Sequence, residues 1–247
     1  FHNMGMMELP NMFYGEVQSG RRAANRGLMT EHGLNYVLDC VIAMKEVLGD
    51  EVGLALDCGP GWTLPDATRF ARALEPYNIM WIEDILTGDY TPYVQADLYR
   101  DLTMSTSTPV HTGEQIYLRQ NFTELIEKQA VNIVGPDPAD IGGIAELKWV
   151  AEYADLHGIL MAPHGTFDGL IGLAALVQVS AAMPQNLIAF EYPIGDPAWW
   201  YDIVDGLPDD IVKNGQIEVW DRPGLGVDII PEAAKPYLPE GDEDFFD

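Results

Sequence analysis

The sequence predicts an α/β fold, a (β/α)8-type TIM barrel in which six strand–helix units are visible. Short apolar runs of strand length alternate with helical patterns at intervals of roughly 25–30 residues, which is the spacing of βαβ units. Strands joined by helices run parallel, because each helix returns the chain to the same edge of the sheet. The length of 247 residues is close to the roughly 250 of a complete barrel. The alternative is an open doubly wound sheet, but the glycine-rich phosphate turn expected after its first strand is missing from the sequence.

The elements follow one another regularly after residue 33. Residues 1–33 show neither a helical nor a strand period and are expected to form a long loop. Residues 34–195 are expected to hold the barrel units, and residues 196–247 an apolar strap and an acidic tail. Strands are expected at residues 52–56, 79–82, 109–113, 131–134, 159–161 and 187–190. Helices are expected at residues 34–48, 65–74, 93–102, 120–129, 144–154 and 167–183.

Local signals set several of these boundaries. Gly49 stops the first helix, and Pro65 opens the second, where its fixed φ suits the first turn. Gly142 and Gly143 allow the helix after them to begin close to the sheet. Asp140 is expected to cap that helix, which is the usual role of a lone acidic residue in such a turn.

Three of the expected strands end at a carboxylate. Asp57 closes the strand at residues 52–56, Glu83 closes the strand at 79–82, and Glu114 follows the strand at 109–113. The carboxyl ends of parallel strands share one edge, so these side chains are expected to converge. Three converging carboxylates repel one another unless a cation lies between them, and hard oxygen ligands suit Mg²⁺.

Asp137, His164 and Glu191 also end expected strands and are expected at the same edge. A carboxylate that accepts a hydrogen bond from an imidazole fixes its tautomer and raises its basicity, as a proton-transferring histidine requires. Glu191 is expected to hydrogen-bond a substrate. His111 is assigned to the surface near this mouth.

Composition limits the partners. The net charge of −26, from 13 Lys and Arg against 39 Asp and Glu, argues against nucleic acid and against an anionic membrane, because both would repel the chain. The simplest interpretation of this charge is a strongly solvated surface. Two cysteines give no disulfide framework, and no signal peptide or membrane span is recognised. A cytoplasmic location is expected.

The motifs around these residues resemble the C-terminal barrel of the enolase superfamily, in its mandelate racemase and muconate lactonizing enzyme branch. They are Leu-Asp-Cys-Gly-Pro-Gly-Trp around Asp57, Trp-Ile-Glu-Asp around Glu83, Thr-Gly-Glu-Gln-Ile-Tyr around Glu114, Gly-Pro-Asp-Pro-Ala-Asp-Ile-Gly-Gly from 135 to 143, Ala-Pro-His-Gly from 162 to 165, and Phe-Glu-Tyr from 190 to 192. They occur in the family's order over roughly residues 34–230. Within the branch the chain is most similar to galactonate-dehydratase-like enzymes.

The resemblance implies three Mg²⁺ ligands, Asp57, Glu83 and Glu114. It implies an enediolate formed by proton removal α to a carboxylate, with His164, oriented by Asp137, as general acid or base. Glu191 would hydrogen-bond the developing enolate. The implied function is a Mg²⁺-dependent lyase that dehydrates a small-molecule sugar acid. A racemase, epimerase or cycloisomerase of the same superfamily, and a non-catalytic barrel fragment, are the alternatives.

The sequence departs from the family pattern at its beginning. The family carries a lysine motif on its second barrel strand and an N-terminal capping domain, and neither is recognised here. None of the five lysines ends a strand of the right rank. The chain is therefore expected to lack its N-terminal barrel units, the capping domain and the base of the second strand. Exposed barrel edges favour association, so a homo-oligomer is expected.

Overall fold

A computed structural model describes residues 9–14, 28–59, 61–86, 94–165, 169–192, 197–208, 210–242 and 244–246. The expected loop at residues 1–33 therefore lies largely outside the described residues. Within it, Phe13 and Met29 form an antiparallel bridge, and Met12 and Met29 are buried in the core.

The centre of the structure is a parallel sheet of five strands in the order β1-β2-β3-β4-β5. The strands are β1 Ala55–Asp57, β2 Trp81–Glu83, β3 Val110–Thr112, β4 Ile133–Val134 and β5 Leu160–Met161. Each pairs with the next along the chain, and the register places Asp57 beside Glu83 and Glu83 beside His111. The strand expected at residues 187–190 is reduced to one parallel bridge between Met161 and Leu187. This segment still lies next to β5 in the strand order, because the Ile188 amide donates to the Met161 carbonyl at 2.9 Å.

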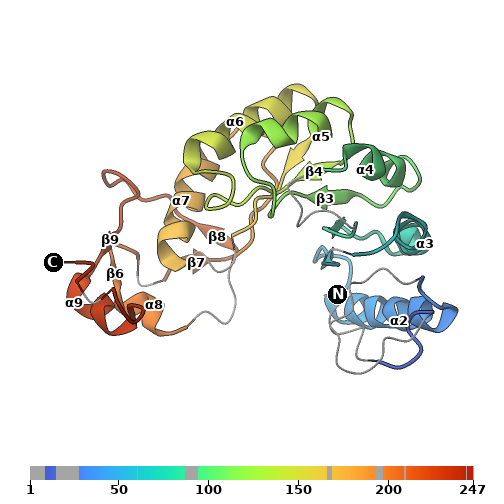
Figure 1. Ribbon diagram of the computed structural model, residues 1–247, viewed down its shortest axis with the longest axis horizontal. Helices are drawn as coiled ribbons and strands as arrows, with labels where there is room; N and C mark the ends of the chain where they lie inside the picture. Colours follow the sequence, from blue (N-terminus) through green and yellow to red (C-terminus); the bar gives the residue numbers. More distant parts are fainter. Residues whose placement is uncertain are drawn as a thin grey trace.

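Helices alternate with these strands and follow them along an arc from α2 to α7 (Figure 1). They are α2 Glu31–Leu48, α3 Leu64–Leu74, α4 Ala96–Thr103, α5 Thr123–Glu127, α6 Ile144–Leu156 and α7 Gly169–Ala181, with 3-10 turns η1 Glu75–Tyr77 and η2 Arg119–Phe122. Thr30 and Thr63 cap α2 and α3, because each hydroxyl accepts a hydrogen bond from a first-turn amide. The prediction that Asp140 caps α6 is wrong. That helix begins after Gly143, whose φ of 102° suits glycine, and it has no side-chain cap.

The strands pack differently on their two faces, as the alternation of side chains requires. On β2, Ile82 lies in the large core between sheet and helices. Trp81 faces the other way, where it packs with Ile133 and Ala162 and with the half-buried Ala55. This second layer, formed by four different strands or strand ends, corresponds to the interior of a barrel.

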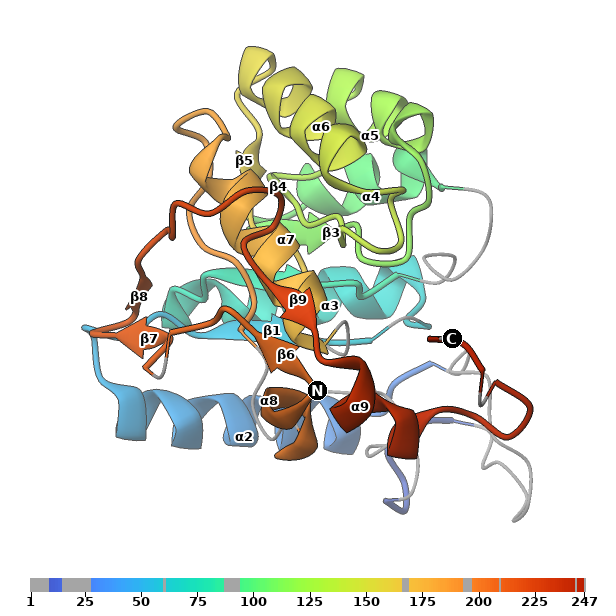
Figure 2. The ribbon, with the colours of Figure 1, turned by 90° about the vertical axis from the view of Figure 1, so that its left-hand side faces the viewer.

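The C-terminal segment adds short elements beside α7 (Figure 2). They are α8 Trp199–Asp202, β6 Val204–Asp205, β7 Val212–Lys213, β8 Gln216–Ile217, β9 Asp228–Ile229, α9 Pro231–Ala234 and η3 Lys235–Tyr237. Val204 and Ile211 pack with Leu170, Leu173 and Val177 of α7 in a separate small core. None of the described helices is long and apolar enough to cross a membrane.

Candidate active site

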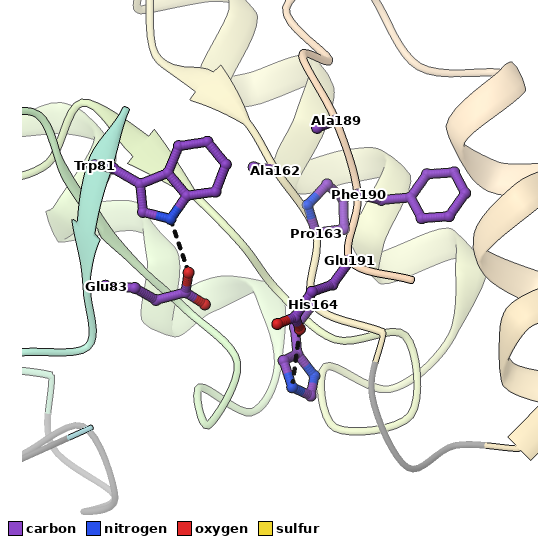
Figure 3. A pocket seen from close by; sticks show the side chains of 8 residues that line it. All are labelled: Trp81, Glu83, Ala162, Pro163, His164, Ala189, Phe190 and Glu191. Atoms are coloured by element: carbon purple, nitrogen blue, oxygen red, sulfur yellow. Dashed lines mark hydrogen bonds and ion pairs between the residues drawn. The ribbon is translucent and has the colours of Figure 1, made fainter. Parts of the chain in front are cut away.

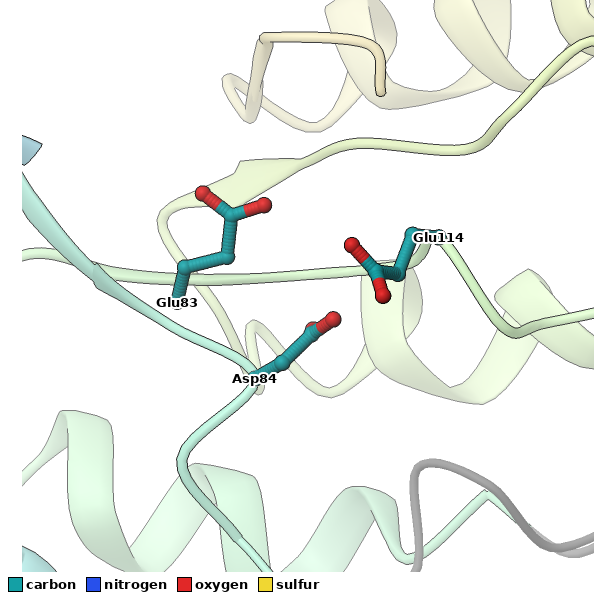
Figure 4. Close-up of side chains that lie close together, drawn as sticks. All are labelled: Glu83, Asp84 and Glu114. Atoms are coloured by element: carbon teal, nitrogen blue, oxygen red, sulfur yellow. The ribbon is translucent and has the colours of Figure 1, made fainter. Parts of the chain in front are cut away.

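Acidic side chains gather where β2 and β3 end. Glu83, Asp84 and Glu114 each place a carboxylate oxygen within 4.8 Å of the others, and Figure 4 shows the three side chains gathered together, with the carboxylates of Asp84 and Glu114 turned toward each other. Glu83 and Asp84 are buried, and Glu114 is half-buried. An all-oxygen, acidic donor set of this kind fits a hard divalent cation such as Mg²⁺.

The structure brings two of the three predicted ligands into this group and places Asp57 at its edge. Asp57 lies next to Glu83 in the register of β1 and β2, but its side chain is exposed, and its carboxylate accepts a hydrogen bond from the Gly59 amide at 2.8 Å. It remains a predicted ligand.

The residue that the sequence analysis missed is Asp84. Strict strand alternation would place it on the face opposite Glu83. The backbone instead leaves the strand there, with φ at 47°, and the carboxylate joins the group. It also accepts a hydrogen bond of 2.6 Å from the Thr112 hydroxyl. The positive φ of a non-glycine residue is visible only in three dimensions, so the sequence carried no signal for this position.

The surroundings of Glu83 shift its proton affinity. Burial raises its pKa to about 7, with support from the charges of Glu191 and Asp57. The Trp81 indole N–H opposes this shift, because it donates to Oε2 of Glu83 at 2.8 Å. A buried carboxylate near other carboxylates is costly to ionise, and a cation in the group would remove that cost.

His164 and Asp137 form the predicted pair. Nδ1 of His164 lies 2.7 Å from Oδ2 of Asp137, and the other oxygen of Asp137 accepts the Ala139 amide at 2.7 Å. Nε2 of His164 points the other way, 3.4 Å from Glu114 and 3.3 Å from Glu191. The imidazole thus connects a buried, oriented carboxylate to the carboxylates of the rim.

The proton affinity of His164 reflects these neighbours. Burial lowers its pKa, but the hydrogen bond with Asp137 and the charges of Glu114 and Glu191 outweigh burial and raise it to about 9. In the metal-free protein these neighbours therefore favour the protonated ring, which carries a proton at Nε2.

A pocket opens beside these groups, between the ends of β2 and β5 (Figure 3). Its polar lining comes from three residues, Glu83, His164 and Glu191. Its apolar lining consists of Trp81, Ala162, Pro163, Ala189 and Phe190. Such a pocket, with few polar groups on one side, suits a small polar ligand held against an apolar wall.

The surface assignment of His111 is wrong. The side chain is 1% exposed, and Nε2 lies 2.9 Å from the Ala162 carbonyl oxygen. Burial lowers the pKa of His111 to about 4, so the ring is neutral and Nε2, which faces an acceptor, carries the hydrogen. Alternating strand periodicity alone does not distinguish the barrel interior from solvent, which is why the sequence did not predict this burial.

Comparison with known proteins places the fold and motifs in a family. Residues 20–233 match the family described as Enolase C-terminal domain-like. This chain is a member of that family. The resemblance noted in the sequence and the TIM-barrel fold class are thereby confirmed, with the five-stranded parallel sheet as the part of the barrel described here.

The relatives of this enolase-family chain include sugar-acid dehydratases. The chain is 36% identical over 234 residues to D-xylonate dehydratase of Haloferax volcanii, covering 94% of this chain and 54% of the relative. It is 31% identical over 197 residues to D-galactonate dehydratase of Variovorax paradoxus, covering 78% of this chain and 50% of the relative. The chain therefore spans about half the length of the curated relatives it matches.

Solved structures agree with this placement. A mandelate racemase/muconate lactonizing enzyme-like protein from Rubrobacter xylanophilus matches with a TM-score of 0.78 at 35% identity, over 89% of this chain and 54% of that protein. The 3,6-anhydro-D-galactonate cycloisomerase from Zobellia galactanivorans matches with a TM-score of 0.73 at 27% identity, over 84% of this chain and 56% of that protein.

Proposed function

We propose that this chain carries the cation-binding and acid–base groups of a Mg²⁺-dependent lyase that removes water from a sugar acid. The observation that carries the proposal is the orientation of His164. Asp137 holds Nδ1 at 2.7 Å, and Nε2 is directed toward Glu114 and Glu191 at the rim. Two relatives above 30% identity are named as dehydratases of D-xylonate and D-galactonate, which supports an aldonate as the substrate class.

Glu83 and Glu114 are the proposed core of the cation site, with Asp57 as the predicted third ligand. Their support is the shared edge of the sheet and the approach of Glu83 and Glu114 within the group described above. When bound, Mg²⁺ supplies positive charge beside the substrate carboxylate, where charge develops as the α proton leaves.

The proposed acid is His164. It transfers the Nε2 proton to the departing hydroxyl, the carbon–oxygen bond breaks, and the hydroxyl leaves as water. Asp137 keeps the ring oriented and stabilises its protonated form before the transfer. Glu191, on the other side of Nε2, is placed to hydrogen-bond the substrate. The base that removes the α proton is not assigned to a residue of this chain, because the lysine motif of the family's second strand is not recognised in it.

The second candidate is a cycloisomerase, racemase or epimerase that uses the same enediolate. The similarity of this chain to the cycloisomerase from Zobellia galactanivorans supports this second candidate reaction. Product analysis separates the two reactions. Dehydration gives a 2-keto-3-deoxy acid, whereas racemisation in heavy water incorporates deuterium at the α carbon without loss of water. A non-catalytic barrel fragment would do neither.

The test replaces His164 by Asn in the full-length protein and measures the keto acid formed from D-xylonate and D-galactonate with Mg²⁺. We expect turnover to fall about 100-fold or more, the usual loss when a positioned acid is removed, with fold and Mg²⁺ binding kept. His157→Asn is the matched control, because the hydrogen bond described for the His157 imidazole is to the Tyr153 carbonyl of α6 and not to a residue of the rim. Full activity in the His164 variant would remove this residue from the mechanism, and absence of any keto acid from the unmodified protein would reject the lyase.

A further inference from the structure

Two aromatic side chains lie directly beneath Glu83 and have no role in the reaction proposed above. Trp81 is two residues before Glu83 on β2, so the pleat of the strand directs both toward the barrel interior. The indole N–H donates to Oε2 of Glu83 at 2.8 Å (Figure 3). One oxygen of the carboxylate is thereby fixed by a neutral donor, and within the described part of the chain no side chain donates a hydrogen bond to the other.

The second aromatic side chain, His111, supports the first. It lies beside Glu83 in the register of β2 and β3, and its ring stacks on Trp81 with centroids 5.3 Å apart and planes 24° apart. Its Nδ1 lies 3.5 Å from Oε2 of Glu83 but carries no hydrogen in this tautomer, so His111 acts on Glu83 through the ring stacked on Trp81 and not through a hydrogen bond. The stack places the imidazole ring against the face of the indole that donates to Glu83.

The far side of His111 is anchored to another strand. Nε2 reaches past β4 and donates to the carbonyl oxygen of Ala162, at the end of β5. A buried N–H needs such a partner, since leaving it unpaired costs roughly 1–3 kcal/mol. The anchor also fixes the ring plane that stacks on Trp81.

Gly135, after β4, makes this reach possible. A Cβ atom there would lie 2.1 Å from Nε2 of His111 and 2.6 Å from the Ala162 carbonyl oxygen. Any residue other than glycine would therefore separate the imidazole from its acceptor. His111 on β3, Gly135 after β4 and Ala162 after β5 are therefore all needed for one hydrogen bond, that of the imidazole to the Ala162 carbonyl.

We propose that Trp81 and His111 are positioning residues, which hold the carboxylate of Glu83 in a fixed orientation and connect it through Ala162 to the strand that leads to His164. The inference rests on the proposed function only for the role of Glu83 as a cation ligand. Partners of this kind orient a ligand before the metal arrives, and their loss typically weakens metal affinity by about 10–100-fold.

The first measurement is Mg²⁺ affinity by titration calorimetry. Trp81→Phe keeps an aromatic ring against His111 but removes the N–H, and we expect the Kd for Mg²⁺ to rise about 10-fold. His111→Phe keeps the stack but loses the anchor at Ala162, and it should act in the same direction. Trp149→Phe is the matched control, because Trp149 stacks on Tyr153 of α6, away from the site, and should leave the Kd unchanged. Equal affinity in the Trp81 and Trp149 variants would overturn the positioning role.

The second measurement does not depend on the cation. In protein with ¹⁵N-labelled tryptophan, the indole N–H resonance of Trp81 is assigned by its loss in Trp81→Phe. We expect it to shift and to exchange faster with solvent in Glu83→Leu and in His111→Phe, while the Trp149 resonance stays in place. An unchanged Trp81 resonance in both variants overturns the inference. If the unmodified protein binds no Mg²⁺ but the resonance shifts as expected, the proposed function fails and the positioning of Glu83 stands.

Discussion

Replacing Asp137 by Asn tests how His164 is held. Oδ1 of Asp137 accepts the amides of Ala139 at 2.7 Å and Asp140 at 3.3 Å, so the oxygen of an Asn side chain is expected to occupy this position. Its NH₂ group then faces Nδ1 of His164, where the carboxylate oxygen was. Since an NH₂ group only donates, Nδ1 must become an acceptor, and the hydrogen of the neutral ring moves to Nε2.

The magnitude follows from the pKa of His164. The difference between its ordinary value of 6.5 and about 9 corresponds to roughly 3 kcal/mol at about 1.4 kcal/mol per unit. Glu114 and Glu191 contribute to this difference and are unchanged in the variant. We therefore assign about half of it, roughly 1.5 kcal/mol, to Asp137, and expect the pKa of His164 to fall by about one unit.

The assay is an NMR titration of the imidazole in the metal-free protein, with the His164 signals assigned by their loss in His164→Asn. The ¹⁵N shifts of the two ring nitrogens report the tautomer directly. Asp140→Asn is the control. Its charge acts on Asp137 and His164, but among the described hydrogen bonds the one that His164 makes at Nδ1 is to Asp137, so the loss of the Asp140 charge should change the pKa of His164 much less. A pKa within error of the unmodified protein, with Nδ1 still protonated in the neutral ring, would refute the reasoning.

Two further outcomes are expected. Asp57→Asn should weaken Mg²⁺ binding at least ~10-fold, and more than Asp84→Asn does. The Asp84 carboxylate is buried and accepts the Thr112 hydroxyl, whereas the Asp57 carboxylate is exposed beside Glu83 and accepts a backbone amide, that of Gly59. Calorimetry that ranks the two variants in the opposite order would assign the third ligand to Asp84. In the metal-free protein, His164 binds its proton more tightly when folded than when unfolded, so its contribution to the free energy of unfolding is complete below pH 6.5 and is lost as the pH rises through about 9. Urea midpoints measured from pH 6 to beyond pH 9 should fall more steeply for the unmodified protein than for His164→Asn, and parallel curves would contradict this assignment.

The sequence by itself determined the order of the strands and the side chains at their ends. The alternation of apolar runs with helical patterns predicted β1 to β5 and the helices between them, because βαβ connections allow only a parallel sheet with one common rim. Glu83, Glu114, Asp137, His164 and Glu191 follow from that rule, and the structure brings all of them to the same place.

The tertiary structure decided the contacts that depend on single dihedral angles and on the shape of the interior. Asp84 enters the carboxylate group because φ is positive at that residue, and α6 begins after Gly143 without the expected cap from Asp140. His111 is buried because Gly135 leaves room above β4, and a sequence pattern with period two gives the face of a residue but not what covers that face. Helix and strand patterns depend on residues that are near one another in the sequence. The contacts of Asp84 and His111 depend on residues of several strands that come together only in the folded protein.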